Sequence, residues 1–148
     1  MSPTNRRRWS PADVCRSHEG WVDTKAMNVD QMLLTIRALV VRDLAAAGCA
    51  DAQTVSIVES AVSDRRWWVE EWPEGAPYLA GQVAQDVQET LAEVYGRWPI
   101  CPLHGDDEPH HELTILPELG ENPHWTCEEY GVTLAALGDL EGWVAPVR

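Results

Sequence analysis

Two short pairs of cysteine and histidine constrain this chain more than any other feature. Cys101 and His104 enclose two residues, His124 and Cys127 enclose two more, and nineteen residues (105–123) separate the pairs. A two-residue gap lets a tight turn direct both side chains at one ion, and two pairs about 15–20 residues apart are typical of a ribbon-type zinc site. We therefore expect one structural Zn²⁺ held by four protein ligands.

The identity of the fourth ligand is left open by the sequence. His124 is the first choice, because it completes a second pair with Cys127. His110 and His111 lie between the two pairs, and either could take the place of His124. Cys15 and His18 repeat the same spacing near the N-terminus, but no second pair accompanies them, so a second zinc site is not expected.

The motifs of common enzymes are missing from the chain. A catalytic zinc keeps a position for water, and Glu108 or Glu112 could then act as a general base. However, the sequence has no H-E-x-x-H motif, no phosphate-binding G-x-x-x-x-G-K-[ST] loop and no G-x-S-x-G elbow. We therefore expect a non-enzymatic protein with no catalytic residues.

Hydrophobic periodicity predicts an α+β chain. Apolar residues recur at helical spacing over 29–47, from Asp51 to Asp64, and over 77–95, which predicts about three antiparallel helices. Residues 112–116 and the stretch around Trp125 and Cys127 suit strands, and 132–137 suits a third strand or a short helix. The expected division is an N-terminal arm (1–28), a helical domain (29–96), a zinc-ribbon-like β module (97–141) and a C-terminal tail (142–148).

Three tryptophans stand close together before a proline. Trp67, Trp68 and Trp72 precede Pro73, in a chain that has eight tryptophans and no phenylalanine. The proline and the glycine that follows it favour an extended or irregular segment over residues 65–73. The rings could fill the core, since no phenylalanine does so, or form an interaction site, since tryptophan is enriched at binding hot spots.

The charge pattern limits the possible partners. The net charge is −13, and residues 65–148 carry four basic and sixteen acidic side chains. We do not expect nucleic acids as partners of this half, because phosphate contacts need lysine and arginine. No apolar run approaches the ~18 residues of a membrane span, and no apolar segment follows Arg6–Arg8 as in a secretory signal. Four cysteines without such a signal favour metal ligands or thiols in the cytoplasm.

The C-terminal segment also resembles a known group. The run from Trp98 to His104, with Trp125–Cys127 and the later Leu137–Leu140, is similar to C-terminal segments of small uncharacterised actinobacterial and phage proteins. The resemblance implies no activity, but it suggests a component of a virion or other assembly. The expected function is a zinc-stabilised protein-interaction module, with a self-assembling structural component or an acidic DNA-mimicking inhibitor as alternatives.

Overall fold

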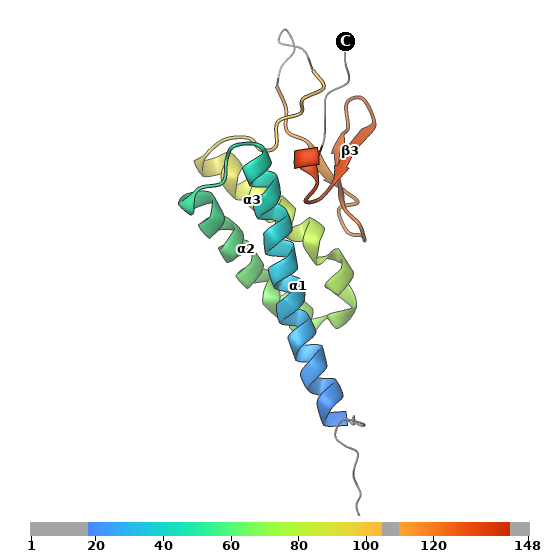
Figure 1. The fold of residues 1–148 in the computed structure, drawn as a ribbon. Helices are drawn as coiled ribbons and strands as arrows, with labels where there is room; N and C mark the ends of the chain where they lie inside the picture. The colour runs from blue at the N-terminus through green and yellow to red at the C-terminus, as the bar shows by residue number, and fades with distance from the viewer. Residues whose placement is uncertain (1–17, 105–109, 143–148) are drawn as a thin grey trace, which may run out of the picture. The chain divides into compact units, whose positions relative to one another are not determined.

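The computed structural model describes residues 18–104 and 110–142. Three helices precede a small three-stranded antiparallel sheet, which confirms the α+β prediction (Figure 1). The chain divides into two units, residues 1–34 and 35–148, and the packing described below is that of the second unit. The expected arm up to residue 17, which includes Cys15, and the tail from residue 143 lie outside the described residues. The elements are α1 (His18–Ala46), α2 (Ala52–Glu71), the 3-10 helix η1 (Pro73–Tyr78), α3 (Leu79–Val94), β1 (Thr114–Leu116), β2 (His124–Cys127), β3 (Val132–Ala136) and the 3-10 helix η2 (Leu140–Gly142).

Helix α1 ends at Ala46, one residue before the end of the predicted helix over 29–47, but it begins earlier, at His18, within the expected arm. In the second unit its apolar positions Ile36, Val40 and Leu44 are buried, at the spacing of one helical face. The helix stops where the sequence suggested, because Gly48 takes the left-handed conformation (φ 73°) that glycine adopts without steric cost.

Helix α2 begins at the predicted cap but ends later than expected. Asp51 accepts a hydrogen bond from the Thr54 amide, and the Thr54 hydroxyl accepts one from the Asp51 amide, which forms a reciprocal capping box. The prediction that residues 65–73 are irregular was wrong, since the helix continues to Glu71. The helix ends at Glu71, with Trp72 as the cap residue directly before Pro73. Trp68 and Trp72 are one helical turn apart, and their rings stack with centroids 5.8 Å apart.

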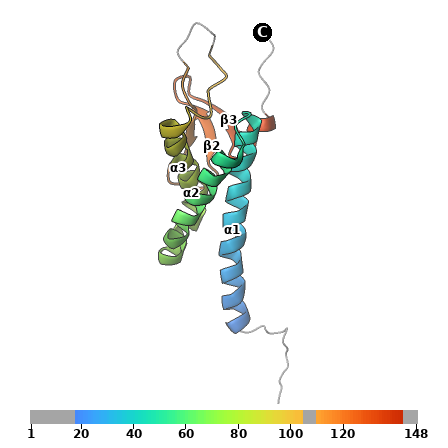
Figure 2. The same cartoon turned by 90° about the vertical axis from the view of Figure 1, so that its left-hand side faces the viewer.

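Helix α3 follows η1 and packs antiparallel beside α2 (Figure 2). Its buried residues fall on one face, as the periodicity of the sequence predicted: Leu79, Val83, Ala84, Val87 and Leu91. Gln88 extends from this helix and donates through its amide nitrogen to the carbonyls of Trp98 (3.1 Å) and Leu113 (2.8 Å). The amide thus holds both segments that flank the first Cys/His pair.

The sheet has the order β1-β2-β3, with antiparallel neighbours. Residues 132–136 form a strand, which decides between the two alternatives left by the sequence. Ile115 pairs with Trp125, and both side chains are fully buried. Trp98 packs edge-on against Trp125, with ring centroids 5.3 Å apart. Tryptophan therefore fills the centre of this core in a chain without phenylalanine.

A buried carboxylate connects α1 to the segment after β3. Asp43 is fully buried and accepts hydrogen bonds from the Trp125 indole (2.7 Å), the Gly138 amide (2.6 Å) and the Leu140 amide (3.1 Å). Burial raises the pKa of Asp43, and the three donors partly oppose that shift. Gly138 is required here, because its φ is 96° and a Cβ atom would collide with Leu39. The sequence analysis did not identify this connection.

Candidate metal centre

Backbone pairing between residues 99–101 and 111–113 positions Cys101 and His111. Ile100 bridges Glu112, the Cys101 amide donates to the His111 carbonyl (2.8 Å), and the Leu113 amide donates to the Pro99 carbonyl (2.7 Å). This pairing sets Cys101 beside His111, and the turn after Cys101 brings His104 back to the same place. Cys127 reaches the same point from the end of β2, since Thr126 pairs with Thr114 only three residues after His111.

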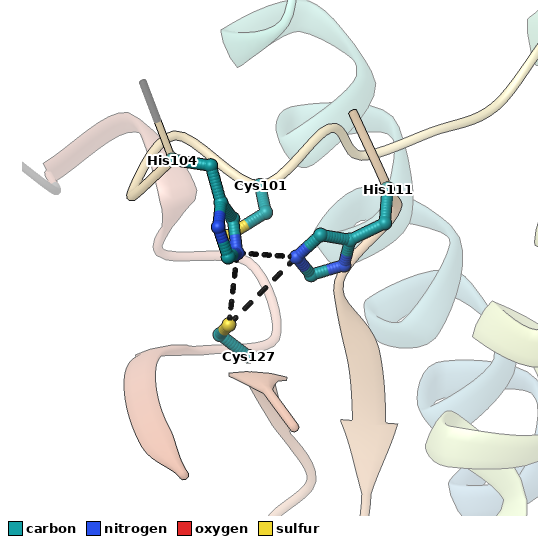
Figure 3. A group of neighbouring side chains, drawn as sticks. All are labelled: Cys101, His104, His111 and Cys127. Carbon is teal, nitrogen blue, oxygen red and sulfur yellow. Dashed lines mark hydrogen bonds between the residues drawn. The ribbon is translucent and has the colours of Figure 1, made fainter. Parts of the chain in front are cut away.

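Four side chains meet at this point: Cys101, His104, His111 and Cys127. Their ligand atoms all lie within 4.8 Å of one another. Nε2 of His104 lies 2.6 Å from Nε2 of His111, and Sγ of Cys127 lies 3.5 Å and 3.8 Å from these two nitrogens (Figure 3). The four residues could therefore hold a metal ion.

The outer nitrogen of each imidazole faces an acceptor. Nδ1 of His111 lies 2.9 Å from the Glu112 carbonyl, and Nδ1 of His104 lies 3.5 Å from a carboxylate oxygen of Glu129. Both acceptors favour the tautomer with hydrogen on Nδ1, which leaves a lone pair on each Nε2. Two lone pairs that face each other at 2.6 Å repel unless a proton or a metal ion lies between them. With hydrogen on both Nδ1 atoms, the two rings are oriented as metal ligands require.

The distances can be compared with those of a tetrahedral site. Zinc bonds of roughly 2.0–2.1 Å to nitrogen and 2.3 Å to sulfur give tetrahedral edges of about 3.6 Å between nitrogen and sulfur and about 3.3 Å between nitrogens. The two sulfur–nitrogen distances of 3.5 and 3.8 Å match the first value. The two imidazoles are closer than the second value, so they would separate by about 0.7 Å around an ion of this size.

The group is shielded from water. Cys127 is fully buried, Cys101 is 6% exposed, and the ring of Tyr130 stacks on His104 with centroids 4.5 Å apart. Burial is also the main cause that raises the pKa of the Cys101 thiol, and the Cys127 thiol beside it adds to the shift. Without a metal the raised pKa favours the neutral thiol. A bound metal ion would instead favour the thiolate, because a coordinating thiol is deprotonated by the metal.

The structure corrects the first choice for the fourth ligand. His124 does not join the group, and its Nδ1 instead lies 2.6 Å from the Asn122 carbonyl. His124 and Cys127 both belong to β2, where alternate residues point to opposite faces, so a three-residue offset separates their side chains. Two ligands with two residues between them converge in a turn or on one face of a helix, but not along an extended strand. His111, one of the two alternatives, occupies the place, whereas its neighbour His110 is exposed.

The potential catalytic bases do not extend this group. Glu112 contributes its backbone carbonyl to His111, and Glu108 lies outside the described residues. The residue that the sequence did not single out is Glu129, two positions after Cys127, beside His104. Its position two residues after Cys127 was the one signal in the sequence that could have pointed to it.

The three clustered tryptophans have different environments. Trp68 is half-buried and stacks on Trp72, and both rings press against Gly75 of η1, where a Cβ atom would collide with them. Trp67, in contrast, is 61% exposed. Two of the rings therefore pack on η1, and the third is largely accessible to solvent.

Fold and site together define a small α+β protein in which a four-residue Cys/His group joins the β sheet to the loop after α3. The chain belongs to the family described as a domain of unknown function (DUF8819), whose model matches residues 29–137. This range includes all four residues of the group and the whole α2–α3 hairpin. Neither the curated proteins nor the solved structures give a match to this chain. Among the described helices, none combines the length and the apolar character needed to cross a membrane.

Proposed function

We propose that this protein is a non-enzymatic, zinc-stabilised protein-interaction module. The observation that supports it most is the convergence of two thiols and two imidazoles on one buried point. Two sulfur and two nitrogen ligands in tetrahedral array suit Zn²⁺ better than Ca²⁺ or Mg²⁺, which prefer oxygen. Four protein ligands complete the coordination of zinc and leave no position for a reacting water, so the role of the ion is structural.

The sheet has a clear need for such an ion. Its strands are three to five residues long, and few of their side chains are available to form a core. Bound zinc would link the loop after α3 to β2 and to the segment before β1. Backbone pairing of 99–101 with 111–113 joins the loop to that segment but does not reach β2. Binding energy of this kind contributes directly to folding. Free thiols at the site also suit a reducing compartment such as the cytoplasm.

The interaction role is supported by the surface of α2. Trp67 is 61% exposed, although a ring of this size gains free energy whenever it is removed from water. Exposed tryptophan is a frequent centre of binding energy in protein interfaces. The excess of acidic side chains in residues 65–148 favours a basic partner surface.

Native mass spectrometry of the full chain, expressed together with its natural neighbours, tests this proposal. We expect one zinc per chain and a retained partner protein, and we expect the Cys101→Ser variant to lose the zinc. The Cys49→Ser variant is the matched control, because Cys49 lies outside the group. A chain that carries no zinc would contradict the metal assignment. A large homomeric assembly would instead favour the virion or assembly component that the phage resemblance suggests, and displacement of DNA from a basic enzyme would favour the inhibitor.

A further inference from the structure

A groove runs between α2 and α3 on the side where Trp67 is exposed. It has a volume of about 490 Å³. Three short side chains of α2 line it and leave space between the two helices, namely Ser56, Ser60 and Ala61. Asp64 lies four residues after Ser60, and Trp67 lies three residues after Asp64, so all three fall on the same face of α2. The groove therefore ends at an exposed indole.

The groove is acidic beyond what its own arginine balances. Arg65 donates to both oxygens of Asp86, at 2.7 and 3.0 Å, and its guanidinium lies 4.7 Å from the Trp68 ring. These contacts fix Arg65 and offset the charge of Asp86. Asp64 and Glu89 also line the groove and are exposed, and among the described residues neither forms an ion pair. One cation thus faces three carboxylates.

The electrostatic effect of all three carboxylates reaches the guanidinium. The pKa of Arg65 is raised, first by its hydrogen bond to Asp86 and further by the negative charges of Asp86, Glu89 and Asp64. A second cation placed between Asp64 and Glu89 would meet the same negative potential without competing for Asp86. An arginine side chain has a further advantage over a lysine side chain, because its flat guanidinium can stack on an indole.

We propose that this groove binds an arginine-bearing segment of a protein partner, with the partner's guanidinium on the face of Trp67 and within reach of Asp64 and Glu89. The inference rests on the proposed interaction function and specifies the chemistry of the partner. It does not depend on the zinc site, because every residue that lines the groove belongs to α2 or α3.

A labelled peptide tests the inference with the full-length, zinc-loaded protein. The probe is a fluorescein-labelled nonapeptide with three arginines in an alanine background, and the control probe carries citrulline, which keeps the shape but lacks the charge. We expect fluorescence anisotropy to detect binding of the arginine peptide only. In a ¹⁵N spectrum, the indole signal of Trp67, assigned by its loss in Trp67→Phe, should shift on titration.

Matched charge variants separate a built site from general attraction to an acidic protein. Asp64→Asn with Glu89→Gln removes two carboxylates from the groove, whereas Glu70→Gln with Glu71→Gln removes two exposed carboxylates from the same helix outside it. We expect the first pair to weaken binding about tenfold and the second less than about twofold. Equal weakening by both pairs, or no shift of the Trp67 indole, would overturn the inference.

The same samples keep the two proposals apart. Zinc content is measured on each variant, and the natural partner found by mass spectrometry is tested against the groove variants. A partner that still binds after the Asp64 and Glu89 substitutions would refute the proposal that the groove is the binding site. It would leave the interaction function intact. Absence of zinc from the unsubstituted protein, with unchanged peptide binding, would refute the metal assignment alone.

Discussion

At the scale of single residues, the centre is defined by the groups behind the ligands. The Glu112 carbonyl and the Glu129 carboxylate face the outer nitrogens of His111 and His104, and so direct both inner lone pairs to one point. Such partners set the orientation and the basicity of a ligating imidazole. Glu129 is exposed and 3.5 Å from its histidine, so its effect should be moderate.

We therefore expect Glu129→Gln to weaken zinc binding about tenfold without loss of the fold. The glutamine can still accept a hydrogen bond, but it lacks the charge that strengthens the imidazole as a ligand. Competition with a chromophoric chelator measures the affinity. Glu128→Gln is the control, because Glu128 contacts Thr114 instead of a ligand. Equal affinities of the two variants would show that the carboxylate beside His104 has no role in binding.

Two tryptophan truncations should differ greatly in their effect on stability. Trp125→Ala removes a fully buried ring together with the indole donor to Asp43, and we expect the free energy of unfolding to fall by about 3–5 kcal/mol. Trp67→Ala removes a mostly exposed ring, and we expect a change of less than about 1 kcal/mol. Urea denaturation gives both values. A loss of ~3 kcal/mol or more for Trp67 would place that ring in the core.

At the scale of elements, periodicity predicted the helices but not all of their ends. The cap at Asp51 and the left-handed Gly48 are local signals, and the structure has both. The end of α2 was misjudged by about two turns, because the stacking of Trp68 on Trp72 and their packing on Gly75 depend on η1, which follows in the chain. Tertiary contacts of this kind override weak local preference.

The fourth ligand was misjudged for a related reason. The spacing of His124 and Cys127 was interpreted as a turn, whereas β-pairing with β1 and β3 keeps these residues extended. Choosing between His110 and His111 required the register of the 99–101 and 111–113 segments, which spacing alone does not contain. Cys101, His104 and Cys127 were found because two of them lie in a turn and cysteine has few other uses.

Removal of the metal should affect the elements unequally. We expect chelation, or the Cys127→Ser substitution, to disorder the sheet and the loop after α3, while the α2–α3 hairpin keeps its helical structure. Helix α2 packs directly on α3, its residues Val58 and Val62 are buried, and its cap at Asp51 is independent of the metal. Backbone ¹⁵N spectra of the zinc-loaded and chelated protein report each element separately. Uniform retention of all signals would show that the sheet folds without an ion.

At the scale of the whole second unit, Asp43 connects its first helix to its last described residues. Burial places the pKa of Asp43 in the folded protein above the 3.8 of a free side chain. The folded state therefore binds a proton more readily than the unfolded state between these two values. The contribution of this proton to stability is complete below pH 3.8 and is lost as the pH rises through the folded pKa.

The variant Asp43→Asn removes this titration and replaces one acceptor oxygen with a donor that faces backbone amides. We expect it to be less stable than the natural protein at every pH, and the deficit to grow as the pH is lowered from 7 toward 4. Urea unfolding of both proteins as a function of pH gives the difference, in which acid release of metal cancels. A constant or shrinking deficit would contradict the raised pKa.

The donors to Asp43 have a consequence for the time at which the protein can fold on the ribosome. Helix α1 is synthesised early, but the amides of Gly138 and Leu140 emerge some ninety-five residues later. Until these amides are synthesised, Asp43 lacks two of its three donors, so we expect the carboxylate to stay in water and the apolar face beside it to stay uncovered. We therefore expect the unit to close only after the segment that follows β3 has been translated.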